Sequence, residues 1–263
     1  MSQFAIFSGV VRYEYRMQIR RRSLWIAYAI FTLLLGAIVF GNDSSTMYKI
    51  LIHPATVPLS EAVVYWATIV NYLFPIVVGV MVADRLPRDR RLNVQELLIT
   101  TSSALRSRVF GKYLGSTLAT LTPILIVYIL SIGYVLCQTH NIVAIPLAIA
   151  AFASVVLPGV LFVSAFSLAC PVMLWVPLYQ FLFVGYWFWG NLFPPNRGIP
   201  TLSDTLLLPL GGNAAMGFFG VQSSSVDHAT VLQGVASIAL LLGIAALVIG
   251  TLLYTLRWQQ ARQ

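Results

Sequence analysis

Residues 231–256 read VLQGVASIALLLGIAALVIGTLLYTL, a run without a single charged side chain. A helix needs about 20 mostly apolar residues to cross the hydrocarbon core of a bilayer, which is about 30 Å thick. This run is longer than that minimum, and nothing in it would hold the chain in water. It therefore predicts a helix that crosses a membrane.

Five further apolar stretches precede this one, separated by polar or turn-rich segments. The six predicted spans are approximately 24–41, 62–83, 113–137, 142–166, 171–190 and 231–256. Pro171 and Pro177 predict a break between the fourth and the fifth, because proline interrupts a helix. We expect an all-α integral membrane protein with a cytoplasmic interfacial helix at 1–23 and a six-span domain at 24–263.

The composition of the whole chain supports the same class. Hydrophobic residues make up 59% of the 263 residues and charged residues only 9%. So few ionisable groups could not cover a water-soluble globule of this size, which excludes a soluble enzyme. A chain this apolar, with 13% aromatic residues, is not intrinsically disordered either.

The position of the basic residues predicts the orientation. The chain has 16 Lys and Arg against 8 Asp and Glu, a net charge of +8. In the six-span layout, all of the basic residues except Lys49 and Arg197 fall on one side. Cytoplasmic loops carry the Lys and Arg excess, so both termini are predicted to be cytoplasmic. The excess is explained by topology and by attraction to anionic membrane lipids, and we expect no nucleic-acid partner.

The segment before the first span has the pattern of an amphipathic helix. Arg12, Arg16 and Arg20 follow one another at intervals of four residues, and apolar side chains fall on the opposite side. This spacing is typical of a helix that lies in the membrane interface. Glu14 falls on the apolar side and interrupts the pattern. The alternative is a basic anchor that only fixes the orientation of the chain.

The loop at 84–112 is the longest segment predicted on the cytoplasmic side. Asn93 can cap a short helix with Glu96 at the third position, a variant of the capping box. That helix would present a large apolar surface outside the bilayer, to which Val94, Leu97 and Leu98 contribute. Either this surface packs against the protein's own helix ends, or it is a docking element for a cytoplasmic partner.

The order of these parts resembles the permease subunits of ABC-2 type ABC transporters. The resemblance is carried by the basic helix around Arg12-Tyr13-Glu14-Tyr15-Arg16-Met17, by six spans and by the first cytoplasmic loop. In that loop, Arg88-Asp89-Arg90-Arg91, Glu96-Leu97-Leu98-Ile99-Thr100-Thr101 and Gly111-Lys112-Tyr113-Leu114-Gly115 are similar to the family's coupling-helix stretch.

Several expectations follow from the resemblance. It implies that a separate ATP-binding cassette ATPase subunit docks on the coupling helix, which energises an exporter of an apolar or amphipathic substrate. It implies a homodimer or a heterodimer of permeases in the plasma membrane of a prokaryote. The residues implied in docking are Asn93, Val94, Glu96, Leu97, Leu98 and Thr101, and those of the elbow helix are Arg12, Glu14, Arg16 and Arg20. The pair Gly111 and Gly115 also fits G-x-x-x-G, a pattern found at helix dimer faces.

The sequence has no nucleotide-binding motif of its own. Gly111-Lys112 is its only Gly-Lys pair, and Arg106 and Tyr113 stand where a P-loop requires Gly and Ser or Thr. We therefore expect no ATPase activity in this chain, no cofactor and no metal. ATP hydrolysis is assigned to a partner.

Two other classes of function remain open. A secondary transporter usually keeps ionisable groups inside its spans, and here every Asp, Glu and His falls in loops or at span ends. A membrane enzyme would need an acid, a base or a nucleophile near a span end, and only scattered loop residues qualify. Four residues are candidates to line a transport pathway, although interhelical hydrogen bonds or an aromatic belt at the interface would also explain them: Asn71, Thr120, Gln180 and Tyr186.

The segment at 191–230, predicted on the outer side, is too long for a simple turn. Its apolar part around 205–221 predicts short helices that dip back toward the membrane, which also resembles the ABC-2 family. Irregular backbone at membrane depth has to be covered by protein or by water.

Overall fold

The computed structural model describes residues 3–41, 46–91, 105–193, 200–222, 226 and 228–260. The regular elements of these residues are helices, and no long strand is present among them. Five of the helical segments are long and apolar enough to cross a membrane: Arg22–Phe40, Leu59–Arg88, Leu105–Thr139, Ala144–Val172 and Val231–Gln259. The described part of the chain is therefore an all-α protein with five candidate membrane spans.

Four of the long helices follow the predicted spans closely. The first and second predicted spans correspond to α2 (Arg22–Phe40) and α4 (Leu59–Ala83). The third corresponds to α7 (Leu105–Thr139), and the last to α12 (Val231–Gln260). The helix α7 begins eight residues before the predicted third span, because the basic residues ahead of that span continue the same helix. Its 35 residues correspond to about 52 Å, well beyond the hydrocarbon thickness.

The fourth and fifth predicted spans are less regular. The fourth consists of α8 (Ala144–Ala151), the π-helical turn η2 (Phe152–Val156) and α9 (Leu157–Ala169). The chain then breaks at the 3-10 turn η3 (Cys170–Val172) and resumes as α10 (Val176–Leu192), so the break predicted from the prolines is confirmed. The helix α10 has 17 residues, about 26 Å, and is shorter than the five candidate spans.

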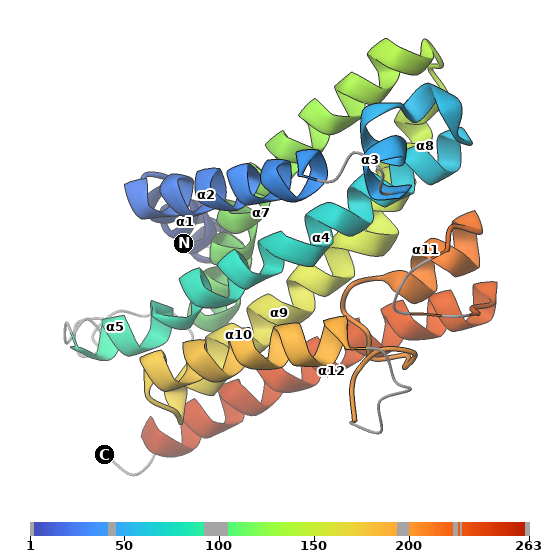
Figure 1. The fold of residues 1–263 in the computed structure, drawn as a ribbon. Helices are drawn as coiled ribbons and strands as arrows, with labels where there is room; N and C mark the ends of the chain where they lie inside the picture. Colours follow the sequence, from blue (N-terminus) through green and yellow to red (C-terminus); the bar gives the residue numbers. More distant parts are fainter. Residues whose placement is uncertain are drawn as a thin grey trace.

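Short elements cap the bundle at its two ends. Figure 1 shows α5 (Arg85–Arg91) and the C-terminus at one end, and α3 (Thr46–Ile52) with α11 (Gly212–Phe219) at the other. The 3-10 turn η1 (Pro54–Thr56) follows α3, and α1 (Gln3–Ile19) packs along the first half of α7. The helix α11 lies in the segment for which the sequence predicts short helices.

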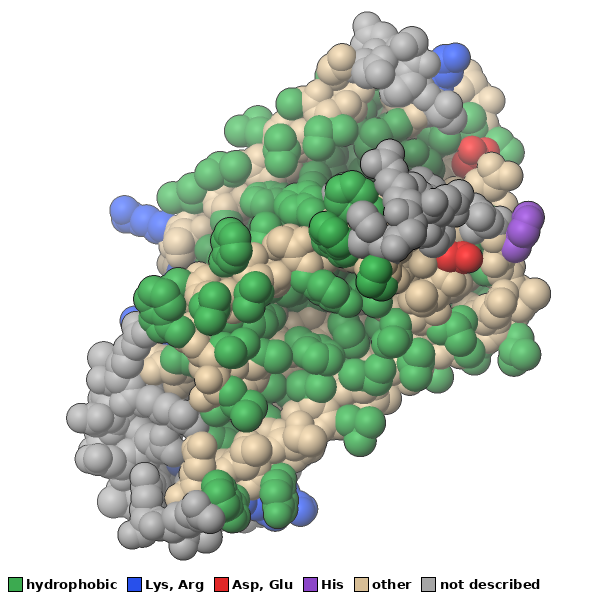
Figure 2. Space-filling model, turned by 60° about the horizontal axis from the view of Figure 1, so that its bottom comes forward, with side chains coloured by type: hydrophobic (Ala, Val, Ile, Leu, Met, Phe, Trp, Pro, Cys, Tyr) green, Lys and Arg blue, Asp and Glu red, His purple; other side chains and the backbone are tan. Residues whose placement is uncertain are grey.

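The helix α4 is the centre of the bundle. It contacts α2, α7, α9 and α10, and most of its length is buried. The helices α2 and α12 are mostly exposed, and most of their exposed residues are apolar, including Leu33 and Leu247. Figure 2 shows hydrophobic side chains across the middle of one face, while the visible charged side chains lie toward the ends. This distribution suits a protein that is embedded in a bilayer, because lipid and not water contacts the middle.

Candidate functional site

Two glycines of α7 let α1 approach its backbone. A Cβ atom at Gly111 would lie 2.7 Å from Val10 Cγ1, and one at Gly115 would lie 2.7 Å from Glu14 Cβ and 2.8 Å from the Val11 carbonyl oxygen. These distances are shorter than real Cβ contacts, so a side chain at Gly111 would displace Val10 and one at Gly115 would displace the backbone of α1. The G-x-x-x-G pattern, interpreted from the sequence as weak evidence for a dimer face, is therefore occupied by a helix of the same chain.

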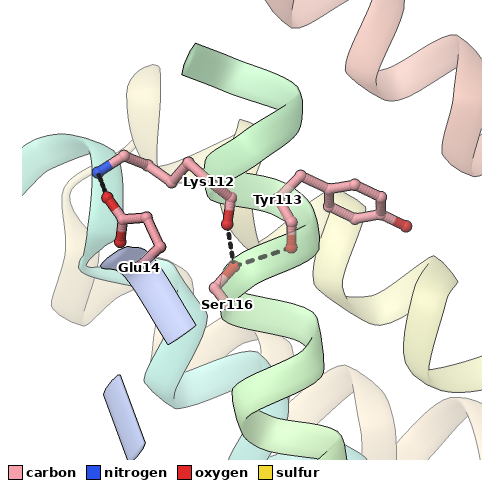
Figure 3. Close-up of polar contacts among 4 residues, drawn as sticks. All are labelled: Glu14, Lys112, Tyr113 and Ser116. Carbon is pink, nitrogen blue, oxygen red and sulfur yellow. Dashed lines mark hydrogen bonds and ion pairs between the residues drawn. The ribbon is translucent and has the colours of Figure 1, made fainter. Parts of the chain in front are cut away.

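An ion pair joins the same two helices. Lys112 Nζ lies 2.8 Å from Glu14 Oε1, and the two side chains are only 10% and 7% exposed (Figure 3). Charges that are largely withdrawn from water need such a partner, because an unpaired buried charge is costly. Glu14, which interrupts the apolar side of the predicted interfacial helix, is thus the residue through which α1 pairs with α7.

The same turn of α7 also contacts α9. Tyr113 points away from Lys112 in Figure 3, and its hydroxyl donates a hydrogen bond of 3.0 Å to the Leu161 carbonyl. Ser116 donates to the carbonyls of Lys112 and Tyr113 at 2.7 and 3.1 Å. One turn of α7 is therefore fixed to α1 on one side and to α9 on the other.

The segment predicted as an interfacial helix contains α1, which has an exposed basic side and a buried side. Arg12, Arg16 and Arg20 are exposed, whereas Glu14 and Gln18 are buried on the opposite side. That buried side rests on α7, and the Tyr15 hydroxyl lies 3.2 Å from the Thr122 hydroxyl. The basic face of the helix is exposed, while its other face packs on α7.

The six residues implied in docking lie outside the described residues: Asn93, Val94, Glu96, Leu97, Leu98 and Thr101. The elements on either side of them are described. The helix α5 ends at Arg91 before this segment, and α7 begins at Leu105 after it. The segment therefore leads directly into the helix that α1 clamps.

Asn71 and Thr120, two of the pathway candidates, are fully buried in the structure. The Asn71 amide donates to the carbonyls of Val155 at 3.0 Å and of Pro209 at 2.9 Å. The Thr120 hydroxyl donates to carbonyls of its own helix, and its carbonyl accepts a bond of 2.9 Å from the Tyr28 hydroxyl. Both residues make interhelical contacts, and a role in transport stays a prediction.

Gln180 and Tyr186 lie on α10. The Gln180 amide donates a bond of 3.1 Å to the Val80 carbonyl on α4, and Tyr186 is 56% exposed. Gln180 also lines an open cleft of about 320 Å³ between the beginnings of α2 and α10 and the end of α4, together with Arg21 and Asp84. The structure does not bring these two residues together with Asn71 and Thr120 into one cavity.

The sequence did not reveal the partners of the buried polar groups. The Glu14–Lys112 pair joins residues 98 positions apart, and the Asn71–Pro209 bond joins residues 138 apart. The available signals were a carboxylate on the apolar face of a predicted helix and a lysine between two glycines. Each signal indicates that a partner is needed, but neither says which residue it is.

The fold and these contacts define a class: a helical protein embedded in a membrane. Within the described residues, no three His, Cys, Asp or Glu side chains gather in a way that could hold a metal ion. Comparison with known proteins gave no match to a family model, to a curated protein or to a solved structure.

Proposed function

We propose that the chain is the membrane permease subunit of an ABC-2 type transporter, energised by a separate ATP-binding subunit that docks on residues 92–104. The observation that carries the proposal is the α1–α7 clamp, defined as Gly111, Gly115 and the Glu14–Lys112 ion pair. The clamp lies on α7, the helix that follows the proposed docking segment in the chain, and it is within three turns of the first residue of α7.

The geometry of α7 supports transmission of movement from that segment. From Leu105 to Thr122 the helix α7 is uninterrupted and acts as a stiff rod, because its backbone N–H groups bond to the carbonyls four residues earlier. Pro123, which has no N–H, comes after the clamp. Movement of the first turn of α7 is carried to α1 through the clamp and to α9 through Tyr113. An ATPase that closes on residues 92–104 would therefore shift three helices together.

In this proposal α10 is the fifth of six spans, in addition to the five candidate spans above, and both termini are cytoplasmic with the docking segment. The C-terminus and α5 lie at the same end of the bundle in Figure 1, as this orientation requires. The proposal includes a second permease copy or a similar permease, the plasma membrane of a prokaryote, and export of an apolar or amphipathic substrate. The spans offer few charges to hold a hydrophilic ion, which favours such a cargo.

Co-expression with a cognate ATP-binding subunit tests the proposal. We expect a stable complex that hydrolyses ATP, whereas the purified chain alone does not. Glu96→Arg or Leu97→Asp should weaken the complex at least tenfold while the permease stays folded. Lys49→Glu is the matched control, because it reverses a charge on α3 at the opposite end of the bundle. Equal association of all three variants would remove the docking claim.

A further inference from the structure

The helix α9 begins with a local irregularity that has a covalent cause. Pro158 has no backbone N–H, so it cannot donate to the carbonyl of Ser154 four residues earlier. The preceding residues form the π-helical turn η2, in which the N–H of Leu157 bonds to the Phe152 carbonyl. A π turn changes the local hydrogen-bond register of the helix and often marks a functional position.

Asn71 of α4 binds to this turn and to a distant segment at once. One amide group donates to the Val155 carbonyl in η2 and to the Pro209 carbonyl, at 3.0 and 2.9 Å. The side chain has no exposed surface. Both donors of the amide are thus used to join other elements. The amide oxygen, Oδ1, has no hydrogen-bond partner among the described residues.

Two glycines allow the three elements to come this close. A Cβ atom at Gly159 would overlap the Pro209 carbonyl oxygen and would lie 3.1 Å from the Asn71 amide nitrogen. Gly211 has a φ of +76°, and a Cβ atom there would lie 2.8 Å from Val155. Glycine accepts this left-handed backbone without the strain that a side chain brings.

The segment held by Asn71 has a second attachment on its other side. The helix α11 packs on α12, where a Cβ atom at Gly217 would lie 2.6 Å from the Thr230 carbonyl oxygen. Residues 200–211 also contact α10 through the Leu202 N–H, which bonds to the Gly190 carbonyl at 2.8 Å. The Asn71 bonds therefore add a polar link between this segment and the centre of the bundle, beside the packing of Leu208 and Leu210 in the apolar core.

We propose that Asn71 is a latch that holds residues 200–211 closed against η2 and α4, so that this end of the bundle opens when its two hydrogen bonds break. The helix α11, which packs on α12 and also contacts α4 and η2, would stay in place. The latch goes beyond the proposed function, since it depends on no ATPase and on no identified cargo. If hydrogen exchange contradicts the latch, the docking proposal is unaffected. If the ATP-binding subunit does not dock, the latch is unaffected.

Hydrogen exchange of the full-length chain in detergent micelles, measured by mass spectrometry, tests the latch. Asn71→Leu keeps the branched shape and the number of side-chain heavy atoms and removes both donors, so the Val155 and Pro209 carbonyls lose their bonds to residue 71. We expect the exchange of amides in 200–211 to rise about tenfold to a hundredfold, because each lost bond of this kind costs roughly a factor of ten. Amides in 113–132 of α7 should change less than twofold.

A second variant disturbs the same contact while residue 71 stays asparagine. Gly159→Ala places a methyl group against the Pro209 carbonyl and should also raise exchange in 200–211. Thr117→Val is the matched control, because its buried hydroxyl bonds only to the Tyr113 carbonyl of its own helix. Unchanged exchange in 200–211 in both variants, or a rise that is equal along the whole chain, would overturn the latch.

Discussion

Removal of one member of the Glu14–Lys112 pair should release α1 from α7. The two side chains are 7% and 10% exposed, so water screens the remaining charge poorly. Breaking a buried ion pair by removing one partner costs about 3–5 kcal/mol. Lys112→Met and Glu14→Leu should each weaken the docking of α1 by an amount of this order, up to the full free energy of docking.

The double variant Glu14→Leu with Lys112→Met separates the ion pair from simple packing. Replacing both charges with apolar groups of similar size is often neutral, since neither charge is then left unpaired. We therefore expect the double variant to recover most of what each single variant loses. Such recovery gives a large coupling free energy in a double-mutant cycle.

The assay is hydrogen exchange of the α1 amides in the full-length chain in detergent. A loss of 3–5 kcal/mol corresponds to an increase in exchange of about 10²- to several 10³-fold. Arg12→Met is the control, because it removes an exposed charge from the same helix and should change the free energy by less than about 0.5 kcal/mol. Single variants that each cost less than about 1 kcal/mol, with additive effects in the double, would refute the reasoning, because a screened surface pair behaves in that way.

Three further outcomes are expected. Gly115→Leu should destabilise the α1 contact by more than about 1–3 kcal/mol in a denaturant titration, while Gly133→Leu, with open space around its Cβ position, should not. Trp187→Phe should lower the stability by about 0.5–1.5 kcal/mol in a similar titration, because its indole N–H bonds to the Tyr72 carbonyl at 3.0 Å. In whole cells, a membrane-impermeant maleimide should label Lys49→Cys but not Arg257→Cys in a chain without its native cysteines; the reverse pattern would invert the orientation.

The helical spans could be predicted from the sequence because hydropathy is a local property. A run such as 231–256 has too few polar side chains to stay in water, and only a helix satisfies its backbone within a bilayer. The exposed face of α1 could also be predicted, because Arg12, Arg16 and Arg20 recur at the helical period. The helix α10 was harder to place, because prolines and a 3-10 turn interrupt the chain before it.

The purpose of the G-x-x-x-G pattern could not be read in the same way. Glycines at 111 and 115 predict that some helix comes close, and a second copy of the chain was one interpretation. The structure places α1 there, with Glu14 supplying the charge that Lys112 needs. The choice between an internal and an external partner depends on how the chain turns between 20 and 24, which hydropathy does not encode.

The sequence by itself determined that this protein is helical, lies in a membrane and carries most of its basic residues on one predicted side. Only the tertiary structure decided which buried polar groups meet, as with Lys112 and Glu14 or Asn71 and Pro209. The physical reason is that apolar burial needs no particular partner, whereas a polar contact does. Burial of apolar surface acts on every residue of a stretch alike, whereas a hydrogen bond or ion pair selects one partner that the fold brings within about 3 Å.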